Sequence, residues 1–137
     1  MNKKIILYTS KTCGFCKALK EEFTKENIQF EEKTNDEYPE EWYKVNYLTR
    51  LPIFPTIVIE SQDTTEDVIL VSGRDFNNAI HAVNAVDYIM GPEYPNYSQQ
   101  SLLLEEVKTL NYTVNNMYKQ LNQAINNINK NGNKKSN

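Results

Sequence analysis

Hydrophobic and polar residues along the first 90 positions follow two periods: alternation at every second residue, and recurrence at every third or fourth. The first period is typical of strands and the second of helices that bury one face. Short apolar runs bounded by turn residues also indicate buried strands. In chain order these patterns predict a strand over residues 3–9, a helix over 14–27, a strand over 28–33, a helix over 39–48, strands over 56–60 and 68–71, and a helix over 75–90.

Local signals at the ends of these segments support the prediction. Pro39 stands at a first helical position, where no backbone N–H is needed. Pro52 and Pro55 bracket an extended segment before the third strand, and residues 61–65 supply a hairpin turn. We expect Asp75 to cap the third helix with its carboxylate.

A different repeat begins after residue 97. Apolar residues follow one another at alternating spacings of four and three, the period of a coiled-coil seam. This seam predicts association with a second copy or a partner helix through residues 103–128, and folding back onto the same domain is the alternative. Leu104, Tyr118 and Ile125 widen the stripe, and opposed charges beside it are missing. The seam residues are Leu103, Val107, Leu110, Val114, Met117, Leu121, Ala124 and Ile128.

The composition divides the chain into four parts. Residues 91–97 contain one glycine and two prolines, which is typical of a linker. We expect the polar C-terminal end to be disordered. The predicted parts are a domain over 1–90, a linker over 91–97, a helix over 98–130 and a tail over 131–137.

Length and charge restrict the classes of function. The 137 residues suffice for one modest core. The formal net charge is −3, and residues 1–90 carry 10 Lys and Arg against 15 Asp and Glu, so we expect no nucleic-acid partner. The apolar runs fall far below the roughly 18 residues of a membrane span, and no secretory signal is visible. We therefore expect a cytoplasmic protein without a membrane partner.

Cys13 and Cys16 are the only cysteines, and they lie at the start of the first predicted helix. Their spacing fits half of a zinc site or a redox-active dithiol. Zinc needs four ligands, and the chain adds only His81, from another helix, so we expect no metal site within one chain.

Thiol exchange fits the pair better. The amides and the dipole at a helix N-terminus stabilise a thiolate at Cys13, which we expect to be the attacking thiol. Lys11 and Lys17 are the expected pKa-tuning residues, because they add positive charge nearby. Cys16, one turn into the helix, is expected to resolve a mixed disulfide on Cys13.

Three segments stand out in chain order: KIILYTSKTCGFCKALK with its CxxC, IFPTIVIE with a proline before the third strand, and VSGRDF after the fourth strand. Together they resemble the glutaredoxin family over about residues 1–90. The resemblance implies an α/β thioredoxin-like fold, β-α-β-α-β-β-α with a four-stranded mixed sheet, to which the C-terminal helix is an extension. It also implies glutathione-linked reduction of protein disulfides or of glutathione mixed disulfides.

The resemblance further implies a set of site residues. Cys13 is the nucleophile, and Pro55 is a cis-proline whose preceding backbone contacts the cysteinyl unit of glutathione. The turn after the fourth strand receives the glutamyl end, and a cation pairs with the glycyl carboxylate. The implied glutathione-binding residues are Lys11, Arg50, Phe54, Pro55, Ser72, Gly73 and Asp75.

The sequence departs from the family pattern in three places. The residues between the cysteines resemble the monothiol CGFS class, with Cys16 in place of the serine. An iron–sulfur cluster held between two chains with glutathione is therefore an alternative cofactor, which the second cysteine disfavours. Ile53 and Phe54 replace the usual Thr-Val, which predicts a bulkier groove. Ser72 replaces a glycine, which limits backbone conformations with positive φ.

Plainer interpretations stand beside these. Asp75 caps a helix whether or not it binds a ligand, and we expect His81 on the surface rather than in catalysis. The alternative to an oxidoreductase is an interaction protein. In that case a glutaredoxin-like head and an oligomerising helix would belong to a larger assembly, for instance one of a bacteriophage.

Overall fold

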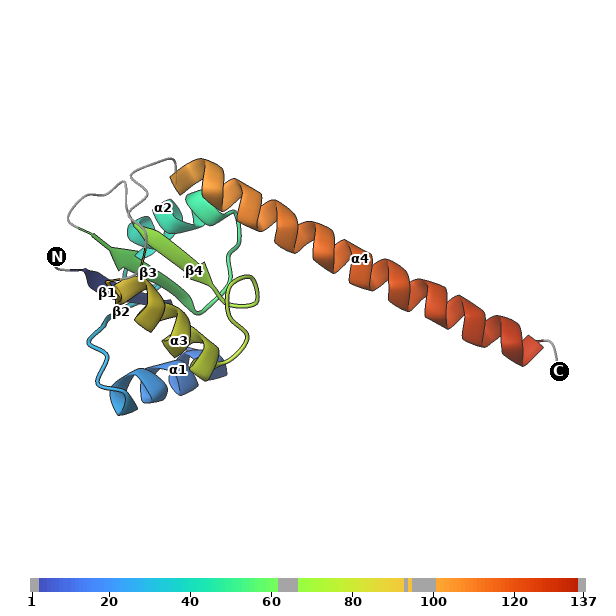
Figure 1. Cartoon of the computed structure of the whole chain (residues 1–137), viewed down its shortest axis with the longest axis horizontal. Coiled ribbons are helices and arrows are strands. Elements are labelled where there is room, and N and C mark those ends of the chain that lie inside the picture. The colour runs from blue at the N-terminus through green and yellow to red at the C-terminus, as the bar shows by residue number, and fades with distance from the viewer. Residues whose placement is uncertain (1–2, 62–66, 93, 95–100, 136–137) are drawn as a thin grey trace.

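A four-stranded sheet with helices on both faces forms the head of the molecule, and one long helix projects from it (Figure 1). The computed structural model describes residues 3–61, 67–92, 94 and 101–135, with side chains for all of these except 101–104 and 131–135. In chain order the elements are β1 (Lys4–Thr9), α1 (Gly14–Lys25), β2 (Glu31–Thr34), α2 (Pro39–Thr49), β3 (Thr56–Glu60), β4 (Val68–Val71), α3 (Ala79–Met90) and α4 (Ser101–Lys135).

The strands form one mixed sheet in the order β2-β1-β3-β4. β1 is parallel to β2 and antiparallel to β3, and β3 is antiparallel to β4. Ile5 lies opposite Ile59 and Ile57 opposite Leu70, so apolar side chains meet across the inner strands. The element order and the mixed sheet of the predicted thioredoxin-like fold are confirmed.

The sheet separates two apolar clusters, because successive side chains of a strand point to opposite faces. On one face, Leu19 of α1 and Val86 of α3 pack in a cluster with Leu7 of β1. On the other face, Val45 of α2 packs in a cluster with Tyr8 of β1. The helices therefore cover both faces of the sheet.

The predicted start of the second strand is wrong. β2 begins at Glu31 instead of residue 28. Ile28 and Phe30 instead pack, partly buried, against the cluster beneath α1 and α3. Their alternation with polar residues thus reflects a loop that covers the core, which sequence pattern alone does not distinguish from a strand.

The predicted cap of the third helix is also wrong. α3 begins at Ala79, and its N-cap is Asn78, whose side chain accepts a hydrogen bond from the His81 amide at 2.9 Å. Asp75 lies three residues before this cap. Because Asp and Asn cap helices about equally well, the sequence alone does not show which of the two begins the helix.

Residues 105–113, which follow the first turn of α4, fix the helix to the head and are called the α4 base below. The Glu105 carboxylate lies 2.6 Å from Arg74 Nη1, and these side chains are only 4% and 2% exposed. Arg74 Nη2 also donates to the Ile69 carbonyl at 3.0 Å and lies 2.7 Å from Asp75 Oδ2. One buried guanidinium therefore joins β4, the segment after it and α4.

Two further side chains of the α4 base strengthen this connection. Thr109 Oγ1 donates to the Thr49 carbonyl at 2.7 Å and so satisfies a backbone group at the end of α2. Lys108 Nζ donates to the Ile69 carbonyl at 3.1 Å and to Glu105 at 3.3 Å. Among the described side chains, hydrogen bonds and ion pairs thus hold the base to the head.

The apolar stripe of α4 lies on the side of the helix away from these contacts, given 3.6 residues per turn. Leu103 and Leu104 fall outside the side chains that the structure describes. Other members of the stripe have exposed fractions between 45% and 68% and form a continuous apolar face. They are Val107, Leu110, Val114, Met117, Tyr118, Leu121, Ile125 and Ile128.

The C-terminal end differs from the expectation. α4 continues to Lys135, so residues 131–135 are helical instead of belonging to a disordered tail. Gly132 lowers helix propensity by about 1 kcal/mol relative to alanine, but no proline ends the helix. Residues 62–65 of the expected hairpin turn, residues 93 and 95–97 of the expected linker, and residues 136–137 of the tail lie outside the described residues.

Within the part of the chain that the structure describes, no helix combines the length and the apolar character needed to cross a membrane.

Replacing Glu105 by Gln is expected to loosen the α4 base. Removing one partner of a buried ion pair costs about 3–5 kcal/mol when nothing compensates. Because Asp75 still faces Arg74, we expect a smaller effect, a 10- to 100-fold faster amide exchange of roughly residues 105–113. Hydrogen–deuterium exchange followed by NMR measures it. Glu106→Gln, at an exposed neighbour, is the matched control, and equal exchange in the two variants would contradict the anchoring role.

Candidate redox site

A disulfide joins Cys13 and Cys16 at the N-terminus of α1. Cys13 is the N-cap residue, and its Sγ accepts a hydrogen bond from the Cys16 amide at 3.1 Å. The sulfur thus takes the place that a side-chain oxygen usually has at a helix start. Cys16 is only 2% exposed, whereas Cys13 is partly exposed. Cys13 is therefore the more accessible sulfur of the pair.

The register of the sheet brings three distant segments to the edge at which β1 ends. Tyr8 of β1 pairs with Thr56 of β3, and Thr56 pairs with Val71 of β4. The disulfide loop follows β1, Pro55 precedes β3, and the turn formed by residues 72–76 follows β4. The three motifs singled out in the sequence therefore lie beyond one row of paired residues.

The segment before β3 combines a buried proline with an aromatic wall. The Phe54–Pro55 peptide bond is cis, and the Pro55 carbonyl accepts a hydrogen bond from the Ser72 amide at 3.2 Å. The Phe54 ring centroid lies 4.4 Å from that of Trp42, which lies 5.8 Å from that of Tyr8. Phe54 is thus held on α2, and its segment is tied to the turn after β4.

An aromatic contact connects the disulfide loop with the same turn. Phe15, between the cysteines, meets Phe76 edge to face with 5.8 Å between the ring centroids. Phe76 is buried and ends the turn 72–76. The turn therefore lies beside the disulfide loop as well as beside Pro55.

The backbone of the turn 72–76 is largely satisfied within the chain. The Gly73 amide donates to the Phe76 carbonyl at 2.8 Å, and the Ser72 amide is bound to Pro55 as described. Gly73 has a φ of 85°, a conformation that favours glycine. The positive φ of this turn therefore falls on Gly73, so the serine at position 72 meets no such constraint.

The Asp75 carboxylate is bound by groups of its own chain. Its Oδ2 accepts hydrogen bonds from the Val71 amide and from Arg74 Nε, both at 2.8 Å. Its Oδ1 lies 3.9 Å from the ammonium of Lys108 on α4. A ligand ammonium at Asp75 would therefore compete with two built-in cations.

The other predicted cations lie on the surface, and two of them have partners. Lys11 Nζ lies 2.8 Å from Asp36, and this hydrogen bond holds the pKa of Asp36 at about 2 and raises the pKa of Lys11. The Arg50 guanidinium stacks 4.6 Å from the ring centroid of Tyr47. Lys17 is exposed on α1. The structure assigns none of the three to the disulfide by direct contact.

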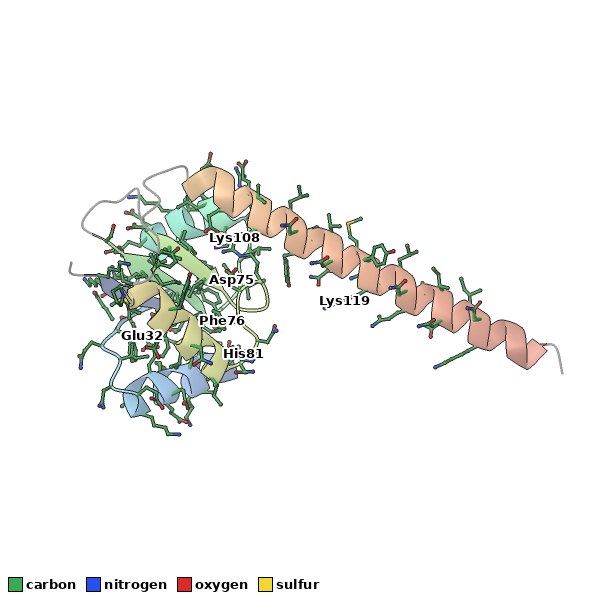
Figure 2. All side chains as sticks on the ribbon, viewed as in Figure 1. Glu32, Asp75, Phe76, His81, Lys108 and Lys119 are labelled. Atoms are coloured by element: carbon green, nitrogen blue, oxygen red, sulfur yellow. A yellow bond between two sulfur atoms is a disulfide. The ribbon has the colours of Figure 1, made fainter. Side chains whose placement is uncertain are left out.

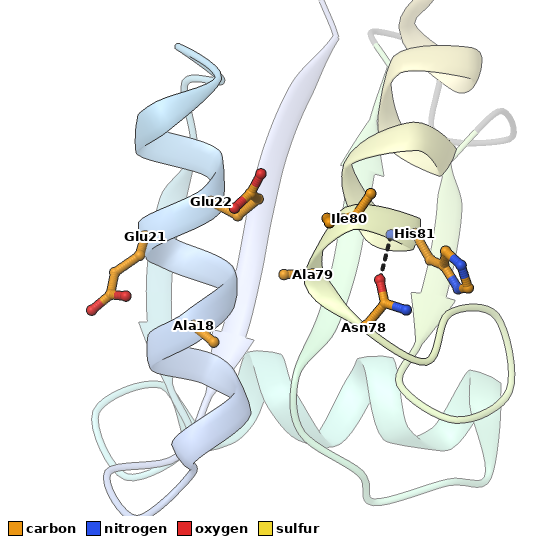
Figure 3. A pocket seen from close by; sticks show the side chains of 7 residues that line it. All are labelled: Ala18, Glu21, Glu22, Asn78, Ala79, Ile80 and His81. Atoms are coloured by element: carbon orange, nitrogen blue, oxygen red, sulfur yellow. Dashed lines mark hydrogen bonds between the residues drawn. The ribbon is translucent and has the colours of Figure 1, made fainter.

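A cavity of about 500 Å³ lies between α1 and α3, and neither cysteine is among its lining residues (Figure 3). Ala18 and Glu22 line it from α1, and Ile80 and His81 from α3. His81 is exposed, as predicted, and its backbone amide is bound by the N-cap residue. Among the described residues, no group of three or more His, Cys, Asp and Glu is placed to hold a metal.

Arg74, Glu105 and Lys108 were missed as site residues by sequence reasoning. Arg74 appears in the quoted VSGRDF motif, but nothing in the sequence connects it with a glutamate 31 positions later. The period of the seam predicts contacts for the apolar side of α4, whereas the polar side contacts the head. Only the folded chain therefore shows that α4 borders the turn 72–76.

Comparison with known proteins adds one finding. The glutaredoxin family model matches residues 5–63, which include both cysteines, Phe54 and Pro55. The turn 72–76 and α4 lie outside the matched residues. No curated protein matches the chain.

Proposed function

From the match of residues 5–63 to the glutaredoxin family model, we propose that the chain is a thiol–disulfide oxidoreductase that reduces protein disulfides with glutathione as reductant. The observation that carries the proposal is the Cys13–Cys16 disulfide at the start of α1, with one sulfur accessible and the other buried. We place the activity in the cytoplasm, where glutathione keeps thiols reduced.

The reaction starts from the reduced dithiol. The Cys13 thiolate attacks one sulfur of the substrate disulfide, forms a mixed disulfide and releases the other substrate sulfur, which takes up a proton as a thiol. The Cys16 thiol then loses its proton and attacks the Cys13 sulfur, which releases the second substrate thiol. The product is the Cys13–Cys16 disulfide of the structure. Two glutathione thiols reduce it again and leave as glutathione disulfide.

The start of α1 supports the role of Cys13. The Cys16 amide that donates to Cys13 Sγ, together with the positive end of the helix dipole, would stabilise a thiolate at this sulfur. Lys11 and Lys17 contribute only the weaker field of exposed charges, and Lys11 shares its charge with Asp36. The helix start is therefore the main source of thiolate stabilisation in this proposal.

We place glutathione along the edge between the disulfide and Pro55. The Phe54 backbone would bind its cysteinyl unit, and Arg50 or Lys11 its glycyl carboxylate. Its glutamyl end would reach Ser72, Gly73 and Asp75, where Arg74 and Lys108 already neutralise the carboxylate. We therefore expect glutathione to bind weakly at its glutamyl end. An iron–sulfur cluster between two chains remains the less favoured alternative, because Cys16 completes a dithiol.

Replacement of each cysteine by serine tests the reaction. We expect Cys13→Ser to abolish glutathione-dependent reduction of a disulfide-bonded peptide, because the remaining thiol, Cys16, is only 2% exposed. In Cys16→Ser, Cys13 should still attack the substrate disulfide, but the mixed disulfide between Cys13 and the substrate should accumulate. Mass spectrometry detects this species. Activity in Cys13→Ser, or its absence in the unmodified chain, would contradict the proposal, and Ser10→Ala in the same loop controls for local disturbance.

The exposed stripe of α4 favours a second function, association through this helix. We expect the partner to be a second copy of the chain, because the α4 seam repeats with a period of 3.5 residues and joins like residues in a symmetric pair. Val107 and Val114 occupy one seam position and Leu110 the other, a combination typical of two-stranded coiled coils. In this interpretation the paired α4 helices join two redox heads. The same pairing is compatible with an interaction protein that belongs to a larger assembly.

Sedimentation equilibrium of the full chain tests the association. We expect a dimer that Leu121→Asp converts to a monomer, because the substitution would bury a charge in the seam. Asn122→Asp is the matched control, since it adds the same charge outside the seam on an exposed polar position. A monomer at all concentrations, or equal behaviour of the two variants, would overturn this second function.

A further inference from the structure

A second cavity, of about 300 Å³, lies between the turn 72–76 and α4. Gly73, Arg74 and Asp75 line it from the turn, and the polar side of α4 lines it from Lys108 to Lys119. Figure 2 shows Lys108 above Asp75 and Lys119 further along α4. α4 therefore forms one wall of a hollow at the edge of the sheet where β1 ends, which is called the redox edge below.

Gly73 lines the cavity without a side chain of its own. A Cβ built on Gly73 would lie 3.6 Å from the Tyr112 hydroxyl, in ordinary contact with it. A longer side chain at this position would therefore extend into the space between the turn and α4. The positive φ of Gly73 also favours glycine, so the same residue shapes the turn and leaves the hollow accessible.

The charges of the lining are unequal. Asp75 is the one carboxylate among the lining residues, and it is bound by Arg74 and faced by Lys108. Lys119, in contrast, has no ion-pair partner among the side chains that the structure describes. Asparagine amides lie between these lysines on the same side of α4. Because Asp75 and Glu105 balance Arg74 and Lys108, the excess positive charge of the hollow comes from Lys119, and the asparagine amides add hydrogen-bond donors.

The walls are fixed before any ligand arrives. The Arg74–Glu105 pair and the Thr109 bond to α2 hold the α4 base against the head. The hydrogen bond from Ser72 to Pro55 and the contact of Phe76 with Phe15 hold the turn 72–76 in place. These parts of the walls lose little conformational freedom on binding, which favours affinity, whereas Lys119 lies beyond the α4 base and is exposed.

We propose that this cavity is a subsite for an acidic side chain next to the disulfide of a protein substrate, with Lys119 as the cation that binds its carboxylate. The inference rests on the proposed function, because it assumes that a substrate disulfide lies at Cys13. The turn 72–76 borders both the disulfide loop and the cavity, so a residue flanking that disulfide follows the turn toward α4. A polyanion fits less well, because residues 1–90 carry an excess of five acidic residues.

A pair of peptides tests the subsite in the full chain. Both contain the same intramolecular disulfide, and they differ only in a flanking residue, Glu or Gln. We expect the unmodified chain to reduce the Glu peptide with a kcat/KM about two- to five-fold higher, the effect of one partly exposed ion pair. Lys119→Gln should remove this preference, Lys119→Glu should reverse it, and added salt should weaken it.

Lys130→Gln is the matched control, because Lys130 is an exposed lysine of the same helix, 11 residues beyond Lys119 and outside the cavity lining. It should keep the preference for the Glu peptide. An unmodified chain without a preference, or a Lys119→Glu variant that keeps it, would overturn the subsite.

A second measurement separates the subsite from the proposed function. If neither peptide is reduced, the proposed function fails, and binding is then measured with linear peptides in which serine replaces cysteine. Larger NMR shifts of the Gly73 and Lys119 amides with the Glu peptide than with the Gln peptide would still support the subsite. Equal shifts with the two peptides would overturn the subsite. If inorganic phosphate shifts these amides as much as the Glu peptide does, the cavity is a general anion site instead of a subsite for an acidic side chain.

Discussion

The antiparallel pairing of β3 with both of its neighbours is the constraint from which the redox edge follows. It places the row of Tyr8, Thr56 and Val71 across three strands. The loop after β1, the segment before β3 and the turn after β4 must then lie beyond the same row. A shift of one residue would turn every side chain of β3 to the opposite face and separate these segments. The apolar clusters on both faces hold the register.

Arg74 adds a second constraint that concerns the extension. Its guanidinium binds Asp75, Glu105 and the Ile69 carbonyl while remaining almost completely buried. An unpaired buried charge would be strongly destabilising, so the head and the α4 base depend on each other. The polar side of the α4 base therefore contacts the head, and the apolar side of α4 is exposed. One helix thus lines a cavity beside the turn 72–76 with its polar side and presents an exposed apolar stripe on the other side.

The sequence predicts what depends on local pattern, and it fails where distant residues meet. The element order and the CxxC at a helix start follow from periodicity, and the mixed sheet follows from the family resemblance of the quoted motifs. The start of α3 does not, because Asp75 and Asn78 are both good caps and only the turn geometry assigns the role to Asn78. The ion pair of Arg74 with Glu105 spans 31 positions and has no local signal. The environment of Asp75 was therefore outside the reach of sequence reasoning.

The reduction potential of the Cys13–Cys16 pair tests the central claim most directly. The full chain is equilibrated in glutathione buffers of defined ratio, the free thiols are alkylated, and the fraction of disulfide is read from the mass. A redox-active glutaredoxin-type dithiol predicts a midpoint of roughly −200 to −230 mV. A midpoint below about −300 mV, the range of structural disulfides, would contradict the account, because glutathione would then leave the pair oxidised.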